Sequence, residues 1–210
     1  MKVKQATYFI TGISTDVGKT VAAAIVTEAL QADYWKPVQA GDLDNSDTHK
    51  VKRLVKNEIS QYHDNSFALQ TPMSPHAAAA IDNVTVTVDK IKRPETTNSL
   101  VIEGAGGLLV PINETETIAD VIRPTDKVIV VSRHYLGSIN HTLMTIELLK
   151  ARNLEIGGII FSGDEHPTTE SIIKKMSGAT VIGRIDEEPY FDENVIAEYA
   201  ERFRESVINL

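Results

Sequence analysis

One short stretch decides the fold class of this chain: Gly12-Ile13-Ser14-Thr15-Asp16-Val17-Gly18-Lys19-Thr20. It follows an apolar run typical of a buried strand and leads into a helical pattern, which is the context of a phosphate-binding loop. Glycine lets the backbone curl so that successive N–H groups point at phosphate oxygens, and the helix adds its positive N-terminal end. We expect Lys19 to neutralise the terminal phosphates of a nucleotide and the Thr20 hydroxyl to ligate Mg²⁺. The stretch predicts a P-loop; the alternative is a βα turn that binds no ligand.

Strand-like and helical patterns alternate on either side of this loop. Continuous apolar or β-branched runs, typical of parallel strands covered on both faces, occur at Thr7–Thr11, Leu100–Glu103, Val128–Ser132, Ile156–Phe161 and Thr180–Ile185, with Tyr34–Trp35 as a shorter candidate. Helical patterns lie at Lys19–Ala32, Thr48–Asn57, Ser138–Ala151, Thr169–Met176 and Asn194–Val207. The alternation predicts βαβ units, hence an α/β P-loop NTPase fold with a mostly parallel sheet and helices on both faces.

The segment from Gly41 to Asn98 departs from this rhythm. It is polar, contains Thr71-Pro72 and Ser74-Pro75, and has no strong strand pattern. We expect loops and short helices that lie over the carboxyl edge of the sheet, where open α/β folds bind ligands. Nothing in the sequence marks a domain boundary, so residues 1–210 are predicted to form one nucleotide-binding catalytic domain.

Composition narrows the class of protein. The net charge of −8 argues against a general nucleic-acid binder, although it does not argue against a local ATP site. The chain has no cysteine, which excludes disulfides, thiolate metal sites and a cysteine nucleophile. No apolar stretch reaches the ~20 residues needed to span a bilayer, and Met1–Gln5 leads into a strand without a secretory signal. We therefore expect a cytoplasmic protein that binds neither membranes nor nucleic acid.

Two acidic residues are candidates for holding the magnesium ion. Mg²⁺ prefers six oxygen ligands and usually recruits one or two carboxylates besides the P-loop hydroxyl. Glu103 ends an apolar strand and is followed by Gly104-Ala105-Gly106-Gly107, which is the position of a Walker-B acid with room for phosphates. Asp47 precedes a helical pattern, and its position taken alone favours the N-cap of that helix over a metal ligand.

A second lysine and a second helix start complete the set of candidates. Lys36 follows the short strand Tyr34–Trp35 and would point into the P-loop cleft, unless it is an ordinary surface lysine. The helix that begins near Ser138 could hold a carboxylate on its free N–H groups, unless Ser138 is simply a cap. No catalytic nucleophile is evident, and phosphoryl transfer does not need one.

Together these elements resemble the dethiobiotin synthetase family. The matching stretches are Gly12–Thr20, Lys36-Pro37-Val38, Asn45-Ser46-Asp47, Ser74-Pro75-His76, Glu103–Gly107 and Leu136-Gly137-Ser138-Ile139-Asn140-His141. The resemblance implies a homodimeric ligase that closes the cyclic urea of dethiobiotin from 7,8-diaminononanoate, CO₂ and MgATP. One amine captures CO₂ as a carbamate, the carbamate attacks the γ-phosphate, and the second amine displaces phosphate.

The resemblance also implies a role for each matching residue. Catalytic roles fall to Lys36, Lys19, Thr15 and Asp16, and the metal ligands are Thr20, Asp47 and Glu103. The nucleotide site comprises Asp16, Val17, Gly18, Lys19, Thr20, Val21, Asp47, Glu103, Gly104, Ala105, Gly106, Ser162 and Gly163. The substrate site comprises Lys36, Ala40, Gly137, Ser138 and Asn140, with the last three reached across the subunit interface.

Three positions depart from the family pattern. Ala40 replaces a common hydroxyl residue, Asp16 replaces a common glutamate, and Ser162 stands where many members have an asparagine that contacts adenine. The alternatives are an amidating P-loop synthetase, a partition-type nucleotide switch or an inactive nucleotide-binding module. The missing cysteine argues against the first, the absence of a lysine in Ile13-Ser14-Thr15 against the second, and the intact lysines and acids against the third.

Overall fold

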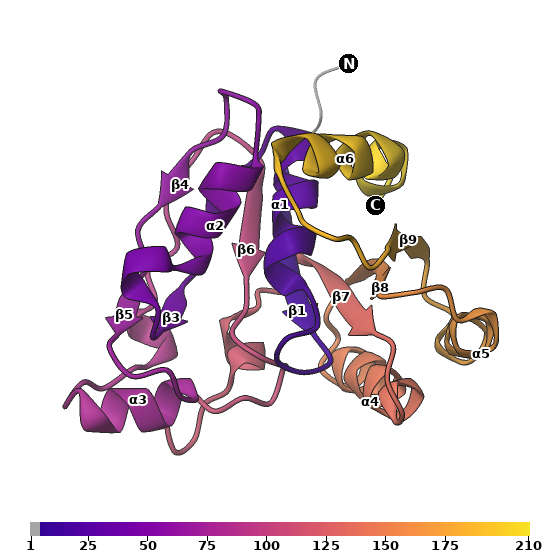
Figure 1. Cartoon of the computed structure of the whole chain (residues 1–210). Helices are drawn as coiled ribbons and strands as arrows, with labels where there is room; N and C mark the ends of the chain where they lie inside the picture. Colours follow the sequence, from indigo (N-terminus) through magenta and orange to yellow (C-terminus); the bar gives the residue numbers. More distant parts are fainter. Residues whose placement is uncertain (1–4) are drawn as a thin grey trace.

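A computed structural model describes residues 5–210. The prediction that the chain has no secretory signal rests mainly on Met1–Lys4, which lie outside the described residues. Its main feature is a parallel sheet with the strand order β4-β2-β6-β1-β7-β8-β9 (Figure 1). The strands are β1 (Thr7–Gly12), β2 (Asp33–Trp35), β4 (Tyr62–His63), β6 (Leu100–Glu103), β7 (Lys127–Arg133), β8 (Ile156–Ser162) and β9 (Val181–Ile185). The predicted strands are confirmed to within one residue at each end.

The helices are α1 (Lys19–Leu30), α2 (Asp47–Leu54), α3 (Pro75–Ile81), α4 (Ser138–Ala151), α5 (Pro167–Ser177) and α6 (Glu193–Ile208). Short 3-10 turns occur at η1 (Leu43–Asn45), η2 (Val88–Lys90) and η3 (Ile118–Val121). All five predicted helices are present, although α2 ends three residues early because Val55 adopts an extended conformation. Among residues 5–210, no helix has the length and apolar character required to cross a membrane.

The expectation that residues 41–98 form loops and short helices is incomplete, because two short strands also lie there. β4 extends the main sheet beside β2, and β5 (Phe67–Leu69) pairs in parallel with β3 (Val38–Ala40) to form a second, two-stranded sheet. These strands have two or three residues each, which is too short for a repeating pattern to stand out in the sequence. They are defined by the neighbouring strands with which they pair.

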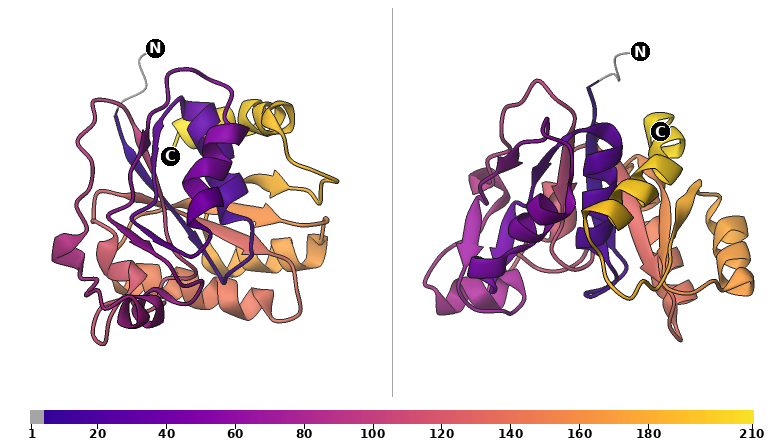
Figure 2. Two further views of the ribbon diagram at one scale, coloured as in Figure 1. Left: turned by 60° about the vertical axis from the view of Figure 1, so that its left-hand side comes forward. Right: turned by 45° about the horizontal axis from the view of Figure 1, so that its top comes forward.

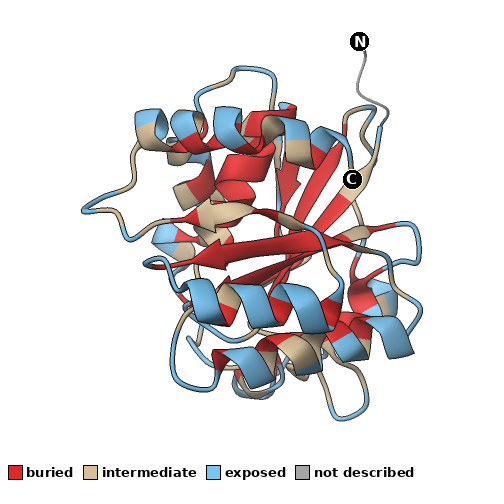
Figure 3. Cartoon of the chain, turned by 90° about the vertical axis from the view of Figure 1, so that its right-hand side faces the viewer, coloured by how far each residue is buried: buried red, intermediate tan, exposed pale blue. Residues whose placement is uncertain are grey.

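Helices cover both faces of the main sheet, as the sequence predicts. α1 and α6 lie side by side on one face, and α4 and α5 lie on the other (Figure 2). Successive residues of one strand point to opposite faces, so Tyr8 and Ile10 join the α1–α6 core while Phe9 joins the α4–α5 core. Figure 3 shows buried strands between helices whose outer faces are exposed. Burial on both faces explains why the strands are continuous apolar runs.

The strand order determines where the functional loops meet. The P-loop follows β1, Glu103 ends β6 and Lys36 follows β2, and β6 lies between β1 and β2. Because the strands are parallel, their carboxyl ends lie at the same edge of the sheet. The sheet therefore brings the three predicted anion- and metal-binding elements to adjacent positions.

Candidate active site

The P-loop curls through two residues in the left-handed region, Asp16 at φ 55° and Gly18 at φ 91°. Gly12 is required by space, because a Cβ atom there would lie 2.5 Å from Val17 Cγ2 and 2.8 Å from the carbonyl oxygen of Ser14. The curl leaves Thr15 and Asp16 exposed and buries Val17 in the core. Val17 can therefore contribute only backbone groups to a nucleotide.

Lys19 is folded back over its own loop. Its Nζ atom donates to the carbonyl oxygen of Ser14 at 2.9 Å, and the residue is buried. Burial lowers the pKa of Lys19, and the nearby Glu103 carboxylate only partly opposes this effect. A phosphate is a stronger acceptor than a carbonyl oxygen, so Lys19 is placed to exchange one partner for the other.

Two carboxylates converge on the ammonium group of Lys36, and a hydroxyl group joins one of these carboxylates. Lys36 Nζ donates to Glu103 Oε1 at 3.0 Å and also to Asp47 Oδ2, while the Thr20 hydroxyl donates to the same Glu103 Oε1 at 3.0 Å. Lys36 is buried, so it is not the surface lysine considered as an alternative. Burial alone would lower the pKa of Lys36, but the charges of Glu103 and Asp47 outweigh it and raise that pKa.

The donor set at this point fits a magnesium ion. Two carboxylates and a threonine hydroxyl are hard oxygen ligands, and a positive group, the Lys36 ammonium, already lies between the carboxylates. Within residues 5–210, no three His, Cys, Asp or Glu side chains form a group that could hold a metal ion. A cation here would therefore have to draw its remaining ligands from phosphates and water, which is how Mg²⁺ is commonly held beside a nucleotide.

The alternative assignment of Asp47 as a helix cap is wrong. The N-cap of α2 is Ser46, whose side chain accepts from the backbone N–H of His49 in a capping box. Asp47 is the first helical residue, and its carboxylate points toward Lys36 and Lys50. Its backbone N–H donates to Gln39 Oε1 at 3.3 Å. Burial raises the pKa of Asp47, but the two lysines more than compensate and leave it lowered.

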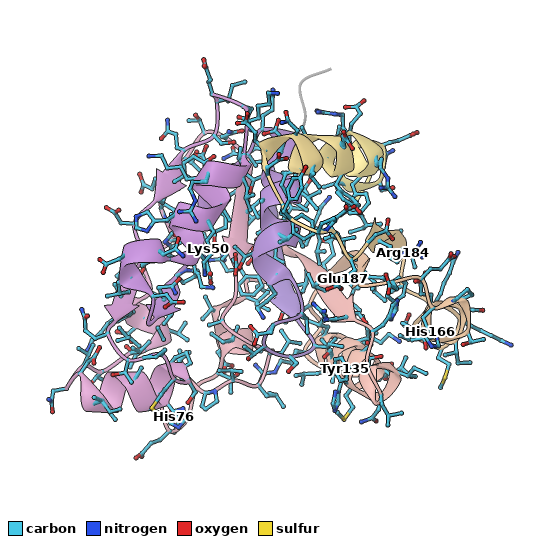
Figure 4. The ribbon with its side chains drawn as sticks, viewed as in Figure 1. Lys50, His76, Tyr135, His166, Arg184 and Glu187 are labelled. Atoms are coloured by element: carbon cyan, nitrogen blue, oxygen red, sulfur yellow. The ribbon has the colours of Figure 1, made fainter. Side chains whose placement is uncertain are left out.

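A cleft of about 810 Å³ opens in front of these residues, within the size range of small-molecule sites. One wall is the P-loop with Lys36, Asp47 and Glu103. The rest of the lining includes Ala40, Ala105, Gly106, Pro72, Met73, Ser74 and Pro75. Ser74-Pro75 thus lies at the cleft, whereas His76 on α3 is exposed and does not line it (Figure 4). Gly104 is turned into the core, where a Cβ atom would lie 3.0 Å from Phe9 Cε1.

A smaller cavity of about 130 Å³ adjoins the P-loop on its other side. It is lined by Gly18, Val21, Arg133, Ser162, Ile185, Asp186, Glu187, Glu188 and Phe191. Ser162 ends β8, and Gly163 follows it at φ 99°. Arg133 lines both cavities. Its guanidinium lies 3.2 Å from the carboxylate of Glu187, which is labelled in Figure 4. Gly18, Val21 and Arg133 line both this cavity and the larger cleft, so the two spaces adjoin.

The start of α4 is separate from both cavities within one chain. Gly137 is the N-cap residue, at φ 103°, and Ser138 is buried as the first helical residue, so the interpretation of Ser138 as a cap is wrong. Asn140 is exposed. None of the three lines the cleft or the smaller cavity. A substrate in the cleft of the same chain would therefore not reach them directly.

Comparison with known proteins identifies the family. A family model described as "AAA domain" matches residues 6–195. A protein of Christiangramia forsetii is 65% identical over 97% of this chain and 98% of its own length. A protein of Cytophaga hutchinsonii is 48% identical over 92% of this chain and 94% of its own length. A protein of Chlamydia pneumoniae is 41% identical over 93% of this chain and 88% of its own length. All three are named ATP-dependent dethiobiotin synthetase.

This chain belongs to the dethiobiotin synthetase family. Solved structures of lower identity show similarity of the fold alone. A putative plasmid partition protein of Borrelia burgdorferi is 13% identical and has a TM-score of 0.62, with 98% of this chain and 99% of that protein covered. A cell division ATPase of Pyrococcus furiosus is 12% identical and has a TM-score of 0.58, with 94% of this chain and 98% of that protein covered. The partition-type alternative is therefore related to this synthetase in fold and distant in sequence.

The structure adds residues to the synthetase site that sequence reasoning missed. Tyr34 donates its hydroxyl to Glu103 Oε2 at 2.8 Å, and Lys50 donates to Asp47 Oδ1 at 3.1 Å. Lys50 on α2 lies beside the cleft (Figure 4), as does Arg133 at the end of β7. In the sequence, Tyr34 lies in a short strand-like run and Lys50 lies within the helical pattern Thr48–Asn57. No local pattern indicates the Tyr34 contact, because it joins two strands that are distant in the sequence. The i,i+3 spacing of Asp47 and Lys50 on one helix is a signal that could have indicated their pairing.

Proposed function

We propose that this chain closes the ureido ring of dethiobiotin from 7,8-diaminononanoate and CO₂ at the expense of ATP, releasing ADP and phosphate. The observation that carries the proposal is the convergence of Lys36, Asp47 and Glu103 beside the P-loop in one cleft. Carbamate and the γ-phosphate are both anions, and two lysines offset their mutual repulsion. The alkyl diamine has space along the wall formed by Ala40, Ser74 and Pro75.

The reaction proceeds in three steps at this cleft. A substrate amine adds to CO₂ and loses a proton, which gives a carbamate. A carbamate oxygen attacks the γ-phosphate of ATP, forming a carbamic-phosphoric anhydride and ADP. The second amine then attacks the carbamoyl carbon, phosphate leaves and the cyclic urea closes. Positioning by surrounding charges is the main catalytic contribution expected in phosphoryl transfer.

Each proposed residue has a position that suits its role. Lys19 and Lys36 hold the γ-phosphate and the carbamate, and Thr15 and Asp16, exposed on the P-loop, contact the diamine. Thr20, Asp47 and Glu103 would hold Mg²⁺, which screens phosphate charge when bound. Backbone groups of Val17 through Val21 and of Ala105 and Gly106 contact phosphates. Ser162 and Gly163 lie toward the base; Gly104 supports the loop from the core.

The substrate carboxylate is proposed to bind at Gly137, Ser138 and Asn140 of a partner subunit in a homodimer. Two features support this assignment. These residues line neither cavity of their own chain, and large apolar side chains are exposed around them, including Leu136, Ile139 and Met144. Exposed apolar groups of this kind are typical of an interface.

A dimer, a cytoplasmic location and the assignment of residues 1–210 to one domain remain predictions.

The test is phosphate release from MgATP and bicarbonate, with and without 7,8-diaminononanoate. We expect release that depends on the diamine, with dethiobiotin in the product. Steady release without the diamine would favour a nucleotide switch of the partition type. No release in either case, with ATP still bound, would indicate an inactive nucleotide-binding module.

A further inference from the structure

The two oxygens of the Glu103 carboxylate have different surroundings. Oε1 faces the cleft and accepts from Lys36 and Thr20, each at 3.0 Å. Oε2 faces into the sheet and accepts from the Tyr34 hydroxyl at 2.8 Å. Tyr34 and Glu103 are both almost completely buried. Oε1 can therefore exchange its partners for a ligand in the cleft, while Oε2 is held by a group inside the protein.

The sheet register explains why Tyr34 can make this contact. Tyr34 on β2 lies beside Val101 on β6, two residues before Glu103, and its hydroxyl reaches the Glu103 carboxylate. Its ring packs against Tyr62 on β4 with ring centroids 6.4 Å apart. The ring is completely buried in the core on the face of the sheet that α1 covers, so the hydroxyl has a fixed position. Phenol is uncharged, so it directs Glu103 without adding electrostatic repulsion to a cation.

We propose that Tyr34 is a positioning residue that makes Glu103 a one-oxygen ligand of the magnesium ion. This inference rests on the proposed role of Glu103 as a metal ligand. Mg²⁺ requires nearly ideal octahedral geometry and suits a carboxylate that offers one oxygen, whereas Ca²⁺ accepts carboxylates through both oxygens and tolerates more ligands. By holding Oε2, Tyr34 favours the smaller ion. Without the hydroxyl, Glu103 can turn both oxygens toward a cation, and the discrimination falls.

The test measures metal binding rather than turnover. Mn²⁺ binding to the ADP-loaded enzyme is followed by electron paramagnetic resonance, and Mg²⁺ and Ca²⁺ are then titrated as competitors. The variant is Tyr34→Phe, which removes only the hydroxyl. The matched control is Tyr62→Phe, the same change in the neighbouring ring. Bound ADP stabilises the folded state of every variant by mass action, and circular dichroism verifies the fold.

We expect Tyr34→Phe to weaken Mn²⁺ binding about tenfold, the usual scale for a residue that orients a metal ligand, and to raise the affinity for Ca²⁺ relative to Mg²⁺. Tyr62→Phe should change neither quantity more than about twofold. The proposal would be overturned if Tyr34→Phe lowered the melting temperature but kept the parental affinity for Mn²⁺ and the parental ratio of Ca²⁺ affinity to Mg²⁺ affinity. Tyr34 would then be purely structural.

A third variant separates this proposal from the proposed function. Glu103→Gln should weaken Mn²⁺ binding more than Tyr34→Phe does, because it removes the charge of the ligand itself. If Glu103→Gln binds Mn²⁺ like the parent, the assignment of Glu103 as a metal ligand fails, and the role of Tyr34 fails with it. If Glu103→Gln weakens binding and Tyr34→Phe does not, only the role of Tyr34 is overturned.

Discussion

The ammonium group of Lys36 lies 3.0 Å from Glu103 Oε1, with both side chains buried at the carboxyl edge of the sheet. Asp47 shares the same ammonium group from the other side. Lys36 therefore balances two carboxylates at the point where the proposed magnesium ion would also bind. Its structural and catalytic contributions can be separated by experiment.

Lys36→Met should abolish turnover and also destabilise the ligand-free fold. Removing one partner of a buried ion pair typically costs about 3 kcal/mol or more of unfolding free energy, because a charge is left uncompensated. Urea denaturation measures this loss, and Mg²⁺ with ADP should recover part of it.

Lys19→Met is the matched control for this change. Lys19 makes one hydrogen bond, to a carbonyl oxygen, among the described contacts, so its removal should cost about 1 kcal/mol while turnover is also lost. Equal stability losses in the two variants would contradict the special role of Lys36.

Asp47→Asn should raise the Mg²⁺ concentration needed for half-maximal rate on the order of tenfold, because a neutral amide is a poorer ligand than a carboxylate. The measurement is a magnesium titration of dethiobiotin formation at saturating ATP. Asp44→Asn, an exposed residue in the neighbouring 3-10 turn, should leave the titration unchanged. A parental titration for Asp47→Asn would restrict Asp47 to its contact with Lys36 and Lys50.

Ser162→Asn should sharpen the preference for ATP. Ser162 lines the cavity next to Gly18 with a side chain too short to offer the paired donor and acceptor that an asparagine amide presents to adenine. We expect the ratio of kcat/KM for ATP to that for GTP to rise on the order of tenfold. Ser171→Asn, exposed on α5, is the control. Equal ratios in all three proteins would show that the base is not read at this position.

Asp33→Asn tests stability away from the active site. The Asp33 carboxylate accepts from Thr96, Asn98 and His63 and from the backbone N–H of Gln61. Burial raises the pKa of Asp33, but these hydrogen bonds outweigh it and leave the pKa below its ordinary value. Because its pKa is lower in the folded state, the ionised Asp33 carboxylate stabilises the fold. This stabilisation is fully present above the unfolded-state pKa of about 3.9 and is lost as the pH falls through the folded-state pKa.

The variant should therefore lose about 2 kcal/mol of unfolding free energy at pH 7, and the difference from the parent should shrink below about pH 4. Urea denaturation at several pH values measures both effects. Asp164→Asn, an exposed residue, should follow the parent throughout. A difference that stays constant down to pH 3 would mean that the charge of Asp33 contributes nothing.

Much of this protein follows from its sequence because the deciding signals are local. Strands covered on both faces must be continuously apolar, so β6, β7 and β8 stand out, and Gly18-Lys19-Thr20 at a strand–helix junction predicts phosphate binding. Glu103 was found for a similar reason, since an acid that ends a buried strand requires a partner.

Only the tertiary structure decided which groups those partners are. Tyr34 and Glu103 are 69 residues apart in the chain, and they meet because β2 lies beside β6 in the sheet. The short strands β4 and β5, and the turn of Asp47 toward Lys36 with Ser46 as the cap, likewise depend on neighbours that are distant in sequence. Local patterns report burial and backbone preference, whereas a contact between distant residues depends on the strand order, which no single stretch of the sequence specifies.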